Sequence, residues 1–254
     1  MSDQNFIERN STKITDILLE VQERTIAELY ALKGSKSAEE FIRLIEGLDV
    51  KAIVNAKAVN AIGTFQISHT GMLESIEGFA TIPEATIQAL ANFNAESLLS
   101  HIDNMSVIIK KEVLKGAISG VGVADILKAV RGQGSLSDRQ LRTLITTAMN
   151  EYSRSVTKVM MDQMPKETLY VYIGALDEKT RKDCLDMMSA GKSTLAEIPT
   201  LTRLGESVLT SGGGYNCRHK WEISVQDKFG HDPKKAQEML DKLERDRLAR
   251  EQSG

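Results

Sequence analysis

Helix-breaking residues are sparse in this chain, and their scarcity is the strongest constraint on how it can fold. The 254 residues contain four prolines and 18 glycines, which leaves long stretches without either. Within these stretches apolar residues recur every three or four positions, as in helices that bury one face. Aromatic residues are only 5% of the chain, and a core of Leu, Ile, Ala and Met favours helices over sheets. The first apolar stripe, between Ser11 and Gly34, comprises Ile14, Ile17, Leu18, Val21, Thr25, Leu29 and Leu32.

More helices are predicted before residue 130. Ser37 and Glu40 have the spacing of a capping box, which places a helix start directly after Ser37. Pro83 suits the first turn of another helix, since the N–H that proline lacks would have no partner there. The polar, glycine-rich segment 131–135 interrupts the pattern, and we place a domain boundary there. Residues 1–130 are therefore expected to form a helical region that docks partners.

The second half of the chain combines a long helix with a short sheet. Ser137 can cap a long central helix that ends before Pro165. Residues 168–173 alternate aromatic and β-branched side chains, which predicts a strand, and a second short strand is predicted near 218–225. The predicted fold class is mainly α with a small α+β C-terminal domain. Two segments are expected after the boundary: the domain over residues 131–231 and a C-terminal amphipathic helix over residues 232–254.

Charge and cysteine content argue against several classes of function. A net charge of −3 lacks the basic excess typical of proteins that coat nucleic acid. Two cysteines cannot form a disulfide framework, so a reducing compartment is expected. The longest stretch without acidic or basic residues, 58–73, is interrupted by polar side chains and cannot span a bilayer. We expect a soluble protein with no signal peptide and no membrane segment.

Polar side chains with capping geometry follow the first predicted strand. Asp177 comes just after the strand and can cap a helix that begins at Glu178. Thr180 supplies a second capping oxygen three residues later. Arg181 and Cys184 are three residues apart, so they can share one face of that helix.

A triple glycine at residues 212–214 precedes the second predicted strand. Glycines permit an unusual backbone path, which here can return Cys217 and His219 toward the first segment. The triplet is not a phosphate-binding loop, because no Lys-Ser or Lys-Thr and no helix follow it. We therefore expect the two segments to fold against each other as a small cluster of polar and thiol groups.

The two segments together resemble the phage Mu F-like minor head proteins, also called head morphogenesis proteins. The signature of that family is a strand followed by Asp-x-x-Thr-Arg-x-x-His, a loop with a proline, and Asn-Cys-Arg-Cys before another strand. The resemblance extends over residues 115–225. We interpret the matching polar residues as structural. This chain matches the signature at Asp177, Thr180, Arg181, Asn216, Cys217 and Arg218.

The resemblance implies a minor structural protein of a tailed-phage head. Proteins of this family look like portal-associated components that act in head assembly or genome delivery. The implied partners are the portal protein and other head proteins, with packaged DNA as a further contact. The implied location is the virion head, preceded by the host cytoplasm during assembly. No enzymatic activity is expected.

Two departures from the signature indicate a metal site. Cys184 stands where the family usually has His, and His219 stands where it usually has the second Cys. Because zinc accepts either thiolate or imidazole, this exchange preserves the set of metal-binding side chains. We hypothesise a structural zinc held by Cys184, Cys217 and His219, with His231 or Asp183 as candidates for the fourth ligand. A packed cluster without a ligand and a Cys184–Cys217 pair are the open alternatives.

Two other classes of function are alternatives to the head protein. One is a metal-dependent hydrolase or nuclease, in which Glu222 would serve as the general base beside the metal. Its site would comprise Asp177, Cys184, Cys217 and His219. The other is a nucleic-acid binding module stabilised by zinc, which the missing basic excess disfavours.

The remaining histidines and a basic cluster are interpreted as residues without a role in a functional site. His69 and His101 have no neighbour in the sequence that suggests an acid–base pair, so surface or core-edge positions are expected. Lys110, Lys111 and Lys115 lie at helical spacing and are expected to form a solvated helix face.

Overall fold

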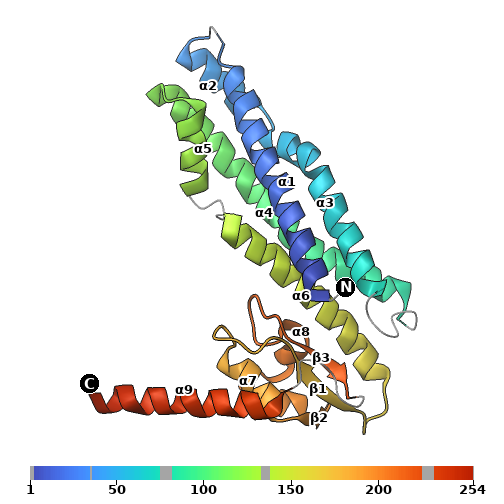
Figure 1. The fold of residues 1–254 in the computed structure, drawn as a ribbon. Helices are drawn as coiled ribbons and strands as arrows, with labels where there is room; N and C mark the ends of the chain where they lie inside the picture. The colour runs from blue at the N-terminus through green and yellow to red at the C-terminus, as the bar shows by residue number, and fades with distance from the viewer. Residues whose placement is uncertain (1–2, 35, 75–81, 133–137, 225–231, 254) are drawn as a thin grey trace. The chain divides into compact units, whose positions relative to one another are not determined.

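The structure is a computed structural model that describes residues 3–34, 36–74, 82–132, 138–224 and 232–253. Over these residues the chain is mostly helical, with a three-stranded antiparallel sheet near its C-terminus (Figure 1). This confirms the predicted fold class. Within the same residues, no helix combines the length and the apolar character that crossing a membrane requires.

Along the sequence, helices both precede and follow the strands of the sheet. They are α1 (Asp3–Ala31), α2 (Ala38–Gly47), α3 (Val50–Glu74), α4 (Glu84–Ser119), α5 (Val123–Gly132), α6 (Asp138–Gln163), α7 (Lys182–Ser189), α8 (Val208–Ser211) and α9 (Pro233–Ser253). The strands are β1 (Leu169–Ile173), β2 (Lys192–Thr194) and β3 (Lys220–Ile223), and two short 3₁₀ turns are η2 (Ile198–Thr200) and η3 (Gly205–Ser207).

The chain divides into two compact units. The first comprises Met1–Met72 and Ala91–Ala148, and the second comprises Leu73–Leu90 and Met149–Gly254. The predicted boundary at 131–135 and the predicted cap at Ser137 fall largely outside the described residues.

Long helices form the first unit. α2 begins at the predicted capping box, in which the Ser37 hydroxyl accepts from the Glu40 N–H at 3.2 Å and the Glu40 carboxylate accepts from the Ser37 N–H at 2.9 Å. α1 packs against α5, and an ion pair of 2.7 Å between Lys57 and Glu28 joins α3 to α1. Apolar side chains fill the interior, among them Ile14, Leu18, Ile26, Phe41, Ile45, Val54, Phe65, Ile102 and Ile109.

The interpretation of His69 as a surface or core-edge residue is wrong. Its side chain is 1% exposed and its ring lies 4.2 Å from the Phe65 ring, measured between centroids. Burial lowers the pKa of His69 to about 4, because an imidazolium ion would lose its hydration there. His101 is half-buried, and burial lowers its pKa as well.

The basic cluster on α4 is only partly a solvated face. The ammonium group of Lys110 donates to the backbone carbonyls of Glu46 and Leu48, at 2.9 and 3.1 Å. It therefore satisfies carbonyls at the C-terminal end of α2, where a positive charge is favourable. Lys115 pairs with the buried carboxylate of Glu112 at 2.8 Å.

The second unit is built around the sheet, whose strand order is β2-β1-β3. β1 and β3 confirm the strands predicted near 168–173 and 218–225, and Tyr172 pairs with Trp221 across them. β2 was not predicted, because three residues are too few to show an alternating pattern. The buried core of this unit comprises Met161, Tyr170, Tyr172, Cys184, Leu185, Met187, Met188, Ile198, Val208, Leu209, Cys217, Trp221 and Ala236.

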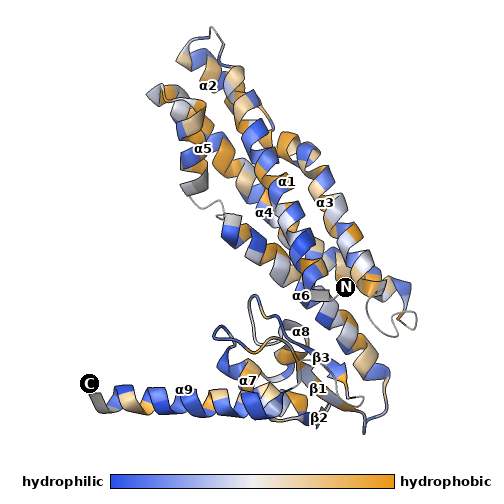
Figure 2. Ribbon diagram, viewed as in Figure 1, coloured by the Kyte–Doolittle hydropathy of each residue, from blue (hydrophilic) through white to orange (hydrophobic). Residues whose placement is uncertain are grey.

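The C-terminal helix packs on the second unit through its first turns. α9 contacts α7, and Ala236 of α9 is fully buried in the core. Residues 241–250 are all exposed, and Figure 2 shows that hydrophilic residues dominate this part of the helix. The apolar face of α9 is therefore covered only near its start.

Candidate metal centre

Two thiols and an imidazole, predicted as metal ligands, lie together in the second unit. Cys184 is on α7, Cys217 is in the turn after the triple glycine, and His219 directly precedes β3. The Sγ atoms of Cys184 and Cys217 are 3.7 Å apart, and Cys217 Sγ lies 3.8 Å from Nδ1 of His219. The three ligand atoms lie within 4.8 Å of one another, and all three side chains are buried.

The ring of His219 is oriented by a backbone carbonyl. Nε2 lies 2.9 Å from the carbonyl oxygen of Ala175. A carbonyl only accepts, so Nε2 carries the hydrogen, and in the neutral imidazole Nδ1 presents its lone pair toward the thiols. Metal-ligating histidines are held in this way, with the second ring nitrogen donating to a carbonyl or carboxylate.

The sulfur of Cys217 is surrounded by hydrogen-bond donors. The backbone N–H groups of Gly213 and His219 donate to it at 3.2 and 3.5 Å, and the Tyr172 hydroxyl lies 3.4 Å away. A hydrogen bond between the sulfurs of Cys184 and Cys217, 3.7 Å apart, lowers the pKa of Cys217 and raises that of Cys184. Of the two thiols, Cys217 is therefore the one that loses its proton more readily.

The triple glycine explains how the backbone can approach these sulfurs. A Cβ atom on Gly213 would stand 2.2 Å from the Sγ of Cys184, far inside van der Waals contact. At Gly212 a Cβ atom would stand 2.9 Å from the Tyr172 hydroxyl and 3.0 Å from Cys217 Sγ, and φ there is +59°. Only glycine leaves room for the site in its present form.

An ion pair joins the two predicted motifs. Arg218 Nη2 lies 2.7 Å from Oδ1 of Asp177, and the hydrogen bond from Arg218 lowers the pKa of Asp177 to about 2. The carbonyl of Ala175 also links the motifs, because it accepts from Thr180 Oγ1 at 3.1 Å and from His219.

The prediction that Asp177 caps a helix beginning at Glu178 is wrong. The Asp177 carboxylate accepts from the N–H of Lys179 at 2.9 Å, and Thr180 Oγ1 accepts from the N–H of Asp177 at 3.0 Å. These short-range bonds close a turn instead of a helix. α7 starts only at Lys182.

Two further motif residues hold the glycine segment. The guanidinium of Arg181 donates to the carbonyl of Gly213 at 3.1 Å and also to that of Tyr215. Asn216 is the one described residue other than glycine with positive φ, at 56°, a conformation that Asn tolerates better than most residues. It reverses the chain just before Cys217.

A buried arginine that the sequence did not single out as functional organises the same turn. Arg154 on α6 is 3% exposed, and its Nε donates to the carbonyl of Thr210 at 2.6 Å. Its Nη1 donates to the carbonyls of Cys217 and His219, at 3.1 and 3.2 Å. The charge of Arg154 also lowers the pKa of Cys217, after the larger effect of Cys184. Nothing in the sequence distinguishes Arg154 from Arg142, an arginine of the same helix that is exposed.

The ligand geometry suits a tetrahedral metal with soft donors. With Zn–S bonds of about 2.3 Å and Zn–N bonds of about 2.0 Å, tetrahedral angles separate two sulfurs by about 3.8 Å and sulfur from nitrogen by about 3.5 Å. The observed separations of 3.7 and 3.8 Å are close to these values. Metal thiolates also accept hydrogen bonds from surrounding groups, as Cys217 does here.

Of the two predicted candidates for the fourth ligand, the structure describes only Asp183. Asp183 faces Arg203 at 3.7 Å and does not belong to the group of ligand atoms around the two cysteines. His231 lies outside the described residues. Glu222, the candidate general base, pairs with Lys220 at 2.9 Å.

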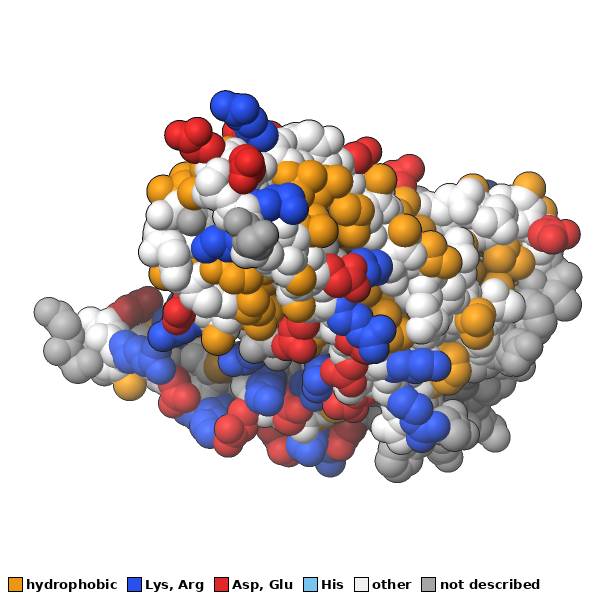
Figure 3. Space-filling view, turned by 90° about the horizontal axis from the view of Figure 1, so that it is seen from above, with side chains coloured by type: hydrophobic (Ala, Val, Ile, Leu, Met, Phe, Trp, Pro, Cys, Tyr) orange, Lys and Arg blue, Asp and Glu red, His pale blue; other side chains and the backbone are white. Residues whose placement is uncertain are grey.

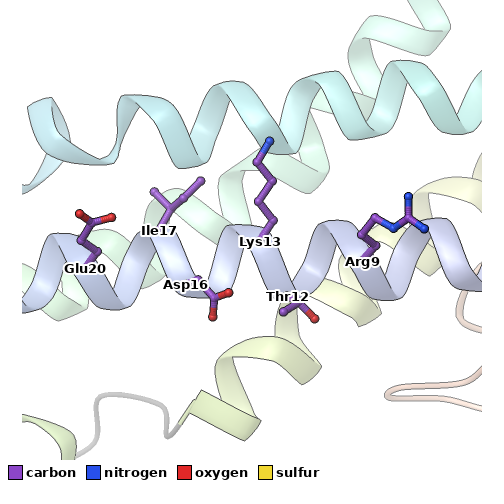
Figure 4. A pocket seen from close by; sticks show the side chains of 6 residues that line it. All are labelled: Arg9, Thr12, Lys13, Asp16, Ile17 and Glu20. Atoms are coloured by element: carbon purple, nitrogen blue, oxygen red, sulfur yellow. The ribbon is translucent and has the colours of Figure 1, made fainter.

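A pocket along α1, in the first unit, brings together no reactive group. In Figure 4 the side chains of Arg9 and Lys13 point to one side of the helix, while those of Thr12 and Asp16 point to the other. Opposite charges and an exposed helix face account for this surface.

In comparisons with known proteins, no family model, curated protein or solved structure matches the chain.

Proposed function

We propose that this chain is a minor structural protein of a tailed-phage head, located in the virion and bound to the portal. The observation that carries the proposal is the 2.7 Å ion pair between Asp177 and Arg218. It joins the two motifs through which the sequence resembles the Mu F-like minor head proteins. The two residues are 41 positions apart in the chain, so their ion pair holds two distant segments together.

The proposal also includes a structural zinc, bound by Cys184, Cys217 and His219 where the two motifs meet. Thiolate and imidazole donors at tetrahedral separations suit zinc better than the hard cations, which prefer oxygen. A bound zinc would hold α7, the glycine turn and the start of β3 together. Its contribution would be to folding stability.

The burial of the ligands favours a structural over a catalytic metal. A catalytic zinc keeps one position open to water and substrate. Here Cys184 is 2% exposed, and Cys217 and His219 are each 3% exposed. This closed environment gives the hydrolase or nuclease alternative little support.

The charges on one face of the molecule give the nucleic-acid alternative little support as well. On the face seen in Figure 3, Lys and Arg side chains are interspersed with Asp and Glu, and hydrophobic side chains lie among them. A protein that tracks a phosphate backbone would present basic side chains together.

Exposed apolar side chains on the long helices support a docking role for the first unit. On α3, Val59 is 64% and Ile67 is 73% exposed, and on α4, Val107 is 68% and Ile118 is 70% exposed. Apolar side chains on helix faces are the groups that helix–helix docking buries. In the proposed role they contact the portal protein.

Co-purification with the portal protein of the same phage tests this function. The full chain, co-expressed with that portal, should elute with the portal ring, and it should be found in purified particles. A Val59→Ser, Ile67→Ser double variant should weaken the association, whereas Gln66→Ser, an exposed polar position on the same helix, should leave it unchanged. Absence from the particles together with no binding to the portal would refute the role, and metal-dependent DNA cleavage would favour the enzyme.

A further inference from the structure

The described ligand cluster supplies three protein donors, whereas a closed zinc site uses four. A further side-chain oxygen beside it is the hydroxyl of Tyr172, 3.4 Å from the Sγ of Cys217. Tyr172 is fully buried on β1, the central strand of the sheet. Its position in the middle of a paired strand makes it a fixed part of the site.

The separation between these two atoms matches that of ligands on one metal. A Zn–O bond of about 2.0 Å and a Zn–S bond of about 2.3 Å at a tetrahedral angle place oxygen and sulfur about 3.5 Å apart. The observed 3.4 Å is close to this value, as the sulfur–sulfur separation of 3.7 Å is close to its own.

The ring of Tyr172 is held in this orientation from two sides. It stacks on the ring of His219, with centroids 5.6 Å apart and an interplanar angle of 15°. The ring of Trp221, its partner across β1 and β3, lies 4.8 Å from it. Packing therefore preorganises the hydroxyl, as rigid neighbours do for metal ligands.

The buried arginine beside the site favours a negatively charged fourth ligand. Zn²⁺ with the thiolates of Cys184 and Cys217 is neutral, and the charge of Arg154, which also interacts with the half-buried Glu151, lies next to it. The Nη2 atom of Arg154 is buried and has no hydrogen-bond partner among the described residues. A phenolate near Arg154 is stabilised by this positive charge, whereas a neutral water as the fourth ligand would not be.

We propose that Tyr172 is the fourth ligand and binds the zinc through its phenolate oxygen. This inference rests on the zinc centre of the proposed function. On binding, the O–H bond of Tyr172 breaks, its proton leaves to solvent and an O–Zn bond forms. The completed site, with two thiolates, one imidazole, one phenolate and Arg154, is then electrically neutral.

Zinc titration of the reduced full-length protein, with Tyr172→Phe and Tyr170→Phe beside the wild type, tests the proposal. Tyr170 is the matched control, because it is a buried tyrosine on the same strand whose hydroxyl faces the carbonyl of Met161. Two readouts are independent of stability: the tyrosinate band in the ultraviolet difference spectrum, and the number of protons released per zinc, measured in two buffers.

The wild type and Tyr170→Phe should develop the tyrosinate band at one equivalent of zinc. Tyr172→Phe should lack the band, release one proton fewer per zinc and bind zinc at least roughly tenfold more weakly. Stoichiometric zinc uptake by the wild type without a tyrosinate band would overturn the assignment of Tyr172 and leave the three-donor zinc centre standing. Failure of the wild type to take up zinc would overturn both, while binding to the portal would still test the head-protein role.

Discussion

The backbone of Gly213 lies directly against the thiol of Cys184, so close that a Cβ atom there would stand 2.2 Å from Sγ. This contact connects the two predicted motifs through packing as well as through the Asp177–Arg218 ion pair. It also explains the triple glycine, because a side chain at Gly212 or Gly213 would occupy the space of a cysteine sulfur.

Gly213→Ala should destabilise the second unit, because the new methyl group overlaps Cys184 Sγ. The expected loss is about 1–3 kcal/mol in urea unfolding, typical of overpacking in a core. Gly63→Ala, in the interior of α3 with open space around the added carbon, should be neutral or slightly stabilising.

A double-mutant cycle separates this contact from a general effect of the glycine. In a Cys184→Ala background the clashing sulfur is gone, and the next atoms are 3.7 Å from the added carbon. Gly213→Ala should then cost much less than in the wild type. Equal costs in the two backgrounds would show that the contact with Cys184 is not the cause.

Arg154→Lys should destabilise the protein although it keeps the positive charge. One ammonium group cannot serve the three carbonyls of Thr210, Cys217 and His219 in the geometry of a guanidinium. We expect a loss of roughly 2–3 kcal/mol in the free energy of unfolding, from buried carbonyls left without a donor. Arg142→Lys on the exposed face of α6 is the matched control, and a similar loss there would contradict this explanation.

Much of the candidate site could be predicted from the sequence, because its donors are chemically distinctive and the glycines between them mark a close approach. Cys184, Cys217 and His219 were predicted to meet, and they do. The helix start was misplaced because Asp and Thr side chains stabilise turns as well as caps, and the choice depends on where Ala175 and Arg218 lie in space. Arg154 was missed because nothing local distinguishes a buried arginine from an exposed one.

The helices show the same division between local and tertiary information. The capping box at Ser37 and Glu40 formed as predicted, since both partners lie within one turn. Burial of His69 was not predicted, because it depends on which face of α3 the neighbouring helices cover. That face is not apparent from the sequence, since small and apolar residues surround the whole helix.

Stability should fall on acidification below neutral pH partly because of His69. The pKa of His69 is about 4 in the folded protein and 6.5 without burial, so the unfolded chain binds more protons between these values. Folding stability should therefore decline as the pH drops from 6.5 toward 4, by up to roughly 3 kcal/mol from this group. His69→Gln should flatten the pH dependence in that window, and parallel curves for the two proteins would contradict the assignment.

The Asp177–Arg218 pair should contribute little to stability because both side chains are partly exposed. The coupling energy from a cycle of Asp177→Asn and Arg218→Gln should be about 0.5–1 kcal/mol. Since the pKa of Asp177 is lowered to about 2, this contribution is present above pH 3.8 and lost as the pH falls toward 2. A coupling energy of zero would show that the ion pair does not help to hold the two motifs together.

Cys217→Ser should abolish zinc binding and lower the melting temperature. With zinc at about 100 times its dissociation constant, binding stabilises the native state by about 2.7 kcal/mol, which corresponds to roughly 5–10 °C for a chain of this size. A chelator should lower the melting temperature of the wild type by a similar amount and leave that of Cys217→Ser unchanged. A chelator effect of equal size on both proteins would place the metal elsewhere.

Metal analysis of the full-length protein, purified under reducing conditions without added chelator, tests the central claim most directly. One zinc per chain in the wild type and none in Cys217→Ser is the predicted result. A wild-type protein that contains no stoichiometric zinc, and acquires none when zinc is supplied, would contradict the metal centre.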